Sequence, residues 1–175
     1  ELARKSRGNR ESFGLQSKDR LSFVTPSEFD YEEDKDFESN VIGLFVNGKK
    51  VDSIDEEGDV AFAKTDFYAL SGGQVADKGM FTADGVEVEV LDVQKTRNKQ
   101  HIHTVKINSG VLEKGLSLHG EVNVKDRLAT TANHSCTHLL QSALVKVLGD
   151  HIHQAGSYNC PEYLRFDFNH YEKVT

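Results

Sequence analysis

The 175 residues are enough for one large domain or two small ones, and 37% hydrophobic with 28% charged residues predict a globular core rather than a disordered chain. The net charge of -7 at pH 7 argues against a purely electrostatic grip on nucleic acid. No apolar run approaches the roughly 20 residues of a membrane span, no signal peptide is visible, and two cysteines without framework spacing favour a reducing, cytoplasmic setting.

The first part of the chain differs in composition from the remainder. Basic side chains outnumber acidic ones there, and we expect residues 1–27 to be a linker or the tail of a preceding helical domain. An acidic run at 28–38 is interpreted as a solvated face or loop without chemistry of its own. The chain starts at Glu1 without a methionine and stops at Thr175, so we expect both ends to be cut rather than natural.

Short strands with tight turns dominate residues 28–125. Asn47-Gly48 and Asp84-Gly85 each lie between apolar runs, which is a strong signal for a β-hairpin. Many short strands with only two prolines predict a small antiparallel β-barrel. His101 and His103 share a strand face and are interpreted as structural or surface residues. The expected strands cover 41–46, 50–54, 59–63, 80–82, 86–93, 101–107 and 118–124.

A glycine-rich stretch at 65–79 interrupts these strands. The paired glycines Gly72 and Gly73 permit positive φ and a close approach of the backbone to a ligand or another chain. Thr65 and Gln74 carry hydrogen-bonding groups that can recognise a small polar substrate. A glycine turn at a barrel corner, without any ligand, is the alternative interpretation. The stretch matches neither the P-loop nor the Gly-x-Gly-x-x-Gly pattern, which disfavours nucleotide binding.

A long helix is predicted after the barrel. Apolar residues recur with a 3.6-residue period from Leu128 to Leu148, and Gly149 is a stop signal. Strands are expected at 151–159 and 163–169. Residues 126–175 are therefore predicted as helix, strand, strand, and burying that helix needs more sheet than two strands provide. Together with the barrel, this predicts an α+β fold.

Two histidines lie on this helix. Residues four apart share a helix face, so His134 and His138 would present two imidazoles in one direction, as in helical zinc sites. Histidines at this spacing are also common as surface or satisfied core residues, and zinc needs three or four ligands. Cys136 points to a different face, and nothing in the spacing of Cys160 requires it as a ligand.

Taken in order, these motifs resemble those of alanyl-tRNA synthetases. The resemblance covers nearly the whole chain and includes the glycine-rich signature of the editing domain, its HxxxH zinc motif and the strand pair after the helix. Leu70 and Ala76 depart from the pattern, where an acidic residue and a glycine are common. The matching runs are Arg20–Phe23, Thr65 with Phe67-Tyr68, Ser71–Gln74 with Asp77, Asn133-His134, Thr137–Leu140, Gly156-Ser157 and Leu164–Phe168.

The resemblance implies a fold and a function. Residues 28–125 would form an elongation-factor-like barrel, and 126–175 the opening half of an α+β editing domain. The parent enzyme would be a cytoplasmic ligase that charges tRNA(Ala) with alanine, using ATP and Mg, neither of which this segment would bind. The editing region would hydrolyse tRNA(Ala) mischarged with serine or glycine. Such a second site is needed because one pocket rejects an added hydroxyl only weakly.

The resemblance also implies roles for individual residues. His134 and His138 would be two zinc ligands, with the others beyond Thr175, and the zinc would either position the substrate or activate water. We therefore expect the isolated segment to bind zinc weakly and to be inactive. Thr65 and Gln74 would contribute to catalysis. The substrate pocket would be lined by Thr65, Gly72, Gly73 and Gln74.

Two alternatives to the synthetase remain open. The first is a free-standing AlaX-like trans-editing hydrolase, and the second is a non-catalytic β-barrel RNA-binding module with incidental histidines. The basic residues before the barrel favour the synthetase, because the free-standing forms tend to begin near the barrel. The sequence does not indicate the oligomeric state.

Overall fold

The computed structural model describes residues 23, 25, 27–31, 36–96 and 98–173. Most of the predicted linker at 1–27 therefore lies outside the described residues, as does the part of the acidic run at 32–35.

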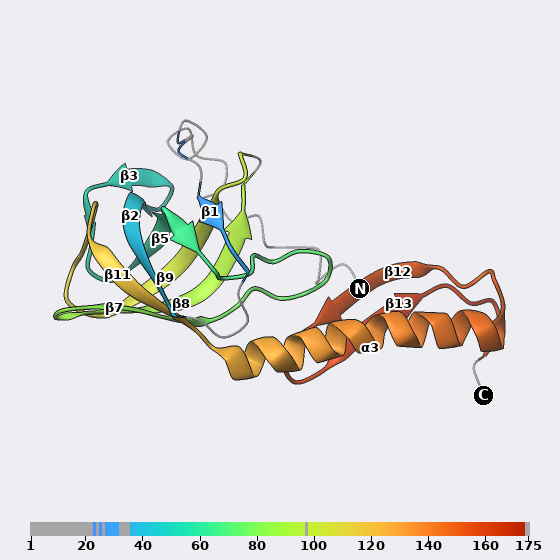
Figure 1. Cartoon of the computed structure of the whole chain (residues 1–175). Coiled ribbons are helices and arrows are strands. Elements are labelled where there is room, and N and C mark those ends of the chain that lie inside the picture. The colour runs from blue at the N-terminus through green and yellow to red at the C-terminus, as the bar shows by residue number, and fades with distance from the viewer. Residues whose placement is uncertain (1–22, 24, 26, 32–35, 97, 174–175) are drawn as a thin grey trace.

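An antiparallel β-barrel forms the first part of the described chain (Figure 1). Within the described residues its six strands follow the order β2-β5-β9-β8-β7-β11, and pairing of β11 with β2 closes the ring. Closure satisfies the backbone groups that an edge strand would leave unpaired. The predicted small barrel is confirmed. Its strands are β2 (Phe37–Val46), β5 (Glu57–Phe62), β7 (Gly79–Ala83), β8 (Val86–Lys95), β9 (His101–Ser109) and β11 (Ser117–Val122).

Several short strands lie outside the six-stranded ring of the barrel. The parallel pair of β1 (Glu28–Phe29) and β6 (Lys64–Thr65) brings the start of the acidic run onto the barrel. The acidic residues described in the run, Glu28, Asp30, Asp36 and Glu38, are exposed, as a solvated face requires. The run is not simply a loop, however, since Phe37 begins β2 and packs its ring against Phe81 at a centroid distance of 5.6 Å. The remaining short strands are β3 (Lys49–Val51), β4 (Ser53–Ile54) and β10 (Leu112–Glu113).

Both predicted hairpins are present. Asn47 and Gly48 join β2 to β3 with φ of 50° and 77°, as the left-handed positions of a two-residue hairpin loop require. Asp84-Gly85 joins β7 to β8, with Gly85 at a φ of 72°. The turn chemistry read from the sequence thus fixes the register of both strand pairs.

Aromatic rings fill the barrel interior. Phe62 stacks on Phe81 with centroids 3.9 Å apart, and Phe67 stacks on the same ring at 5.2 Å. All three side chains are fully buried, and each contributes about 1.5–3 kcal/mol by leaving water. Phe67 belongs to the glycine-rich stretch, so the core itself anchors that stretch.

The predicted helix is α3 (Val124–Leu148), which leads away from the barrel (Figure 1). The Asn123 side chain caps it by accepting from the Asp126 amide, and Gly149 ends it at a φ of 113°. Its buried residues are polar or charged: Arg127, Thr130 and Thr137. Several of the apolar residues that predicted the helix are exposed, with Leu139 at 70% and Val147 at 79%, and Leu144 and Leu148 are only half-buried.

The helix is covered by one hairpin of β12 (Gln154–Asn159) and β13 (Leu164–Phe168), which runs alongside it (Figure 1). This agrees with the expectation that two strands are too little sheet to bury it. The strand predicted from residue 151 begins later, because His151 instead bonds His170 with the two ring nitrogens 2.8 Å apart. In the described part of the chain, no helix combines the length and apolarity needed to cross a membrane.

Candidate functional site

The glycine-rich stretch meets α3 through one side-chain contact. His134 Nδ1 lies 2.8 Å from Gln74 Oε1, although the two residues are 60 positions apart. The His134 and His138 rings stack with centroids 5.1 Å apart and planes 22° apart. The structure therefore brings together Gln74 and both predicted zinc ligands.

With the Gln74 amide oxygen facing the ring, this contact matches the tautomer of His134 that carries its proton on Nδ1. The amide oxygen of Gln74 only accepts, so Nδ1 of His134 carries the proton and donates it. A neutral imidazole protonated at Nδ1 keeps its lone pair at Nε2. A hydrogen bond of this kind orients histidines that ligate metals. The His134 ring is thus arranged to offer Nε2 to a ligand.

The side chains present fit zinc in type but not in number. Imidazole nitrogen is a common zinc ligand, and protein zinc sites use at least three ligands from the protein. Across the described ranges, no group of three or more histidine, cysteine, aspartate or glutamate side chains gathers in a way that could hold a metal. Cys136 is exposed, and the buried Cys160 thiol contacts Tyr163 O at 3.4 Å. A zinc ion at His134 and His138 would need further donors from elsewhere.

The paired glycines make a tight turn that extends the β12 hairpin. Gly72 and Gly73 have φ of 57° and 81°. Ser71 and Gln74 exchange backbone hydrogen bonds across them, at 3.2 and 2.9 Å. The backbone of Asn159 in β12 forms hydrogen bonds with Gly73 and Val75, the two residues that flank Gln74. These glycines therefore form a tight turn, and this turn carries Gln74 to the helix.

We expect an added methyl group to lower the free energy of unfolding by different amounts at Gly72 and Gly73. Gly72→Ala is expected to cost about 1–2 kcal/mol of unfolding free energy, since its Cβ meets open space and only the left-handed backbone is strained. Gly73→Ala is expected to cost at least about 3 kcal/mol, because its Cβ would also overlap Ser157 Oγ and lie 2.9 Å from Ser157 O. Urea unfolding of the two variants measures the difference, and equal losses would contradict the close packing.

Thr65 lies elsewhere, inside the barrel. Its side chain is fully buried. The Thr65 hydroxyl lies 2.8 Å from His103 Nε2 and accepts from the Phe67 amide at 3.2 Å. In the described part of the chain, no hydrogen bond joins it to Gln74 or His134. Among the described residues, the hydrogen bonds of the Thr65 hydroxyl thus go to the barrel and not to Gln74 or His134.

His103 is the partner that sequence reasoning did not connect to Thr65. Burial, helped by the nearby His101, lowers the pKa of His103 to about 3. The neutral ring then donates from Nδ1 to Val60 O at 3.3 Å and accepts the Thr65 proton at Nε2. Burial and the Lys95 charge likewise lower the pKa of His101 to about 4. The structural interpretation of this histidine pair agrees with its burial.

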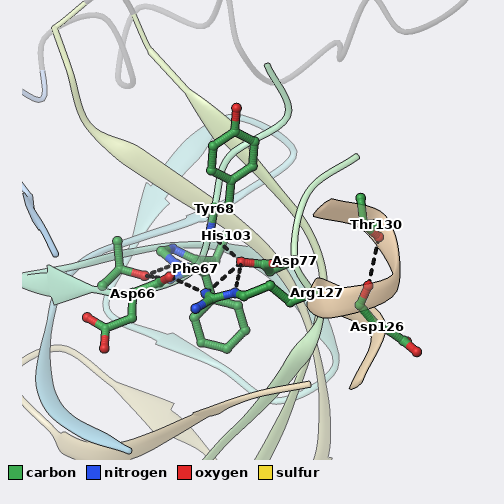
Figure 2. A network of polar contacts seen from close by, with 9 residues as sticks. Asp66, Phe67, Tyr68, Asp77, His103, Asp126, Arg127 and Thr130 are labelled. Carbon is green, nitrogen blue, oxygen red and sulfur yellow. Dashed lines mark hydrogen bonds and ion pairs between the residues drawn. The ribbon is translucent and has the colours of Figure 1, made fainter. Parts of the chain in front are cut away.

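A buried ion pair fastens the glycine-rich stretch to the start of α3. Figure 2 shows Arg127 reaching Asp77, with Nε and Nη2 at 3.0 and 2.7 Å from Asp77 Oδ2. The same oxygen accepts from the Tyr68 amide at 2.8 Å, and Arg127 Nη2 also donates to Asp66 O. The side chains of Arg127 and Asp77 are 2% and 4% exposed. Sequence reasoning missed Arg127, because one basic residue in a polar helix start carries no signal.

A cavity of about 590 Å³ lies beside this ion pair. Its walls come from the glycine-rich stretch, β8, α3 and the turn between β12 and β13, and include Asp77, Arg127 and Tyr163. Gln74, His134 and His138 are not among its lining residues. We therefore place the candidate site at the Gln74–histidine contact, where groups with defined chemistry meet.

Comparison with known proteins supports the resemblance seen in the sequence. The family described as tRNA synthetases class II (A) matches residues 1–126. An alanine–tRNA ligase of Petrotoga mobilis is 46% identical over 156 residues, covering 87% of this chain and 18% of that protein. Those of Bacillus mycoides and Bacillus anthracis are 47% and 48% identical over 139 residues, covering 78% of this chain and 16% of each protein. The chain thus spans less than a fifth of the length of these relatives. It belongs to the alanyl-tRNA synthetase family of class II.

Proposed function

We propose that this chain acts as part of a longer cytoplasmic alanine–tRNA ligase, which charges tRNA(Ala) with alanine using ATP and Mg. The support is the identity of 46–48% to proteins of that name over most of the chain. Within that enzyme, the barrel, α3 and the β12–β13 hairpin form part of the site that hydrolyses Ser- or Gly-tRNA(Ala). An editing site meets a physical need, because a pocket for alanine rejects serine only weakly.

The hydrogen bond from His134 to Gln74 is the observation that carries the editing proposal. It joins the glycine-rich stretch to the HxxxH helix and leaves Nε2 of His134 free beside the parallel ring of His138. The amide of Gln74 fixes the orientation of that ring. His134 and His138, with donors from outside the described residues, would hold a zinc ion, which supplies Lewis-acid chemistry when bound.

The substrate would be met by the backbone of the glycine turn. Gly72 has open space beside its α-carbon, so a ligand can approach the chain closely there. Gly73 and Gln74 would complete this lining from beneath: Gly73 packs against Ser157, and the buried Gln74 side chain bonds His134. Thr65 stays a predicted pocket residue, and its hydroxyl would have to leave His103 to meet a serine side chain.

Ser-tRNA(Ala) deacylation by the full-length enzyme tests this function. His134→Ala is expected to lower the deacylation rate more than about 100-fold, because it removes a ligand rather than a supporting group, whose loss costs about 10–100-fold. Gln74→Ala is expected to fall within that smaller range. Alanylation should be unchanged in both variants, since the proposal places charging elsewhere in the enzyme.

His153→Ala is the matched control, since His153 is exposed and lies in the same α3–hairpin unit. It should leave deacylation intact. Full deacylase activity in His134→Ala would overturn the editing proposal and favour a non-catalytic, RNA-binding barrel. Deacylation without any alanylation by the natural protein would instead favour a free-standing hydrolase.

A further inference from the structure

Asn159, the last residue of β12, lies where the glycine turn and α3 meet. The backbone N–H of Asn159 donates to Gly73 O at 2.7 Å, and the backbone carbonyl of Asn159 accepts from the Val75 N–H at 3.0 Å. These two bonds bracket Gln74 from both sides along the chain. The backbone of Asn159 therefore fixes where the Gln74 side chain begins.

The side chain of Asn159 makes the second connection. Thr137 Oγ1 donates to Asn159 Oδ1 at 2.6 Å, and both residues are almost completely buried. Thr137 lies on α3 between His134 and His138, on the turn that carries both rings. One residue thus bonds the turn that holds Gln74 and the helical turn that holds its histidine partner.

Stability alone does not explain an asparagine at this position. The Nδ2 of Asn159 is one of the few buried side-chain polar atoms without a hydrogen-bond partner in the described part of the chain. A buried donor left unpaired costs free energy that an apolar side chain of similar size avoids. The single proton of the Thr137 hydroxyl is shared between Asn159 Oδ1 and Asn133 O, which lies at 3.0 Å, so Thr137 keeps an acceptor when Asn159 is replaced.

We propose that Asn159 is a positioning residue, which sets Gln74 at hydrogen-bonding distance from His134 through its bond to Thr137. The effect on editing rests on the function proposed above. The geometric part does not, because it concerns only the distance between an amide oxygen and a ring nitrogen. Losing the Asn159–Thr137 bond would let α3 move relative to the turn, and the His134 ring would lose its preference for a proton on Nδ1.

Asn159→Val, Thr137→Val and the double variant test this inference in two ways. Nitrogen NMR of the 175-residue chain reports which ring nitrogen of His134 carries the proton. We expect one tautomer in the natural chain and a mixture in each variant. In the full-length enzyme we expect the kcat for Ser-tRNA(Ala) deacylation to fall about 10–100-fold, as when a supporting residue is lost, with little change in KM. The double variant should be no worse than the worse single variant, because both break one bond.

Thr131→Val is the control for Thr137→Val, since Thr131 makes the same kind of hydroxyl bond to the helix backbone, to Leu128 O at 3.0 Å, without touching the turn. It should leave the tautomer and kcat unchanged. An unchanged His134 tautomer in both Asn159→Val and Thr137→Val would overturn the inference, as would a loss of kcat that only accompanies a loss of folded protein. If the natural enzyme does not deacylate, the proposed function fails, while the NMR result still decides the role of Asn159.

Discussion

Replacing Arg127 with methionine is expected to lower the free energy of unfolding by about 3–5 kcal/mol. Methionine keeps an apolar stem but removes the guanidinium, which donates to Asp77 Oδ2 at 3.0 and 2.7 Å. The Asp77 carboxylate, with a side chain only 4% exposed, would keep the Tyr68 amide as its partner. A buried carboxylate without a countercharge costs far more than the ion pair itself contributes. Urea unfolding at pH 7 measures the loss.

Arg165→Met provides the matched control. Arg165 pairs with Asp167 at 3.2 Å, but both side chains are more than 40% exposed, so the loss should be no more than about 1 kcal/mol. Adding Asp77→Asn to Arg127→Met should recover part of the stability, because the uncompensated charge disappears. A loss for Arg127→Met no larger than that for Arg165→Met would show that the ion pair does not fasten α3 to the barrel.

Acid is expected to destabilise the barrel progressively as the pH falls below 6.5. The folded state keeps His103 neutral, because burial lowers its pKa from 6.5 to about 3. The unfolded chain takes up that proton as the pH falls below 6.5, while the folded chain does not. The contribution of neutral, buried His103 to the free energy of unfolding is therefore complete above pH 6.5 and is lost progressively toward pH 3. Within this window the loss approaches about 1.4 kcal/mol per pH unit for one such histidine.

The slope of unfolding free energy against pH, between pH 6 and pH 4, measures this effect. His103→Gln is expected to be less stable at pH 7 but to have a flatter slope. His119→Gln is the control, since a bond to Glu38 raises the pKa of this exposed histidine. The raised pKa of His119 affects stability in the opposite direction: its contribution to the free energy of unfolding is present at low pH and is lost as the pH rises. An unchanged slope in His103→Gln would assign the acid sensitivity to other groups.

Local features of the fold were predictable because their causes are local. Asn47-Gly48 specifies a hairpin by the positive φ that both residues tolerate, and Gly149 ends the helix for the same reason. Which side of α3 is buried was not predictable. The apolar period marks Leu139, yet Thr137 is buried in its place, because the available partners are the polar groups of the turn and the hairpin.

The candidate site was only partly predictable. The glycine-rich and histidine motifs were recognised by resemblance, but nothing in their spacing brings Gln74 to His134 across 60 residues. That contact depends on the path of the chain through a closed barrel. Arg127 and Asn159 were missed because each looks ordinary in its own element. Their roles arise only from partners that are distant in sequence.

The backbone bonds between the glycine turn and β12 affect how this region opens. Glycine-rich segments usually open locally at little free-energy cost, independently of the rest of a domain. Here two backbone hydrogen bonds join the turn to β12: the Val75 N–H donates to Asn159 O, and the Asn159 N–H donates to Gly73 O. We therefore expect fraying of the turn and melting of the hairpin to occur together, as one cooperative unit. Disturbances at the distal end of that hairpin would thus reach the glutamine amide without any rearrangement of the barrel.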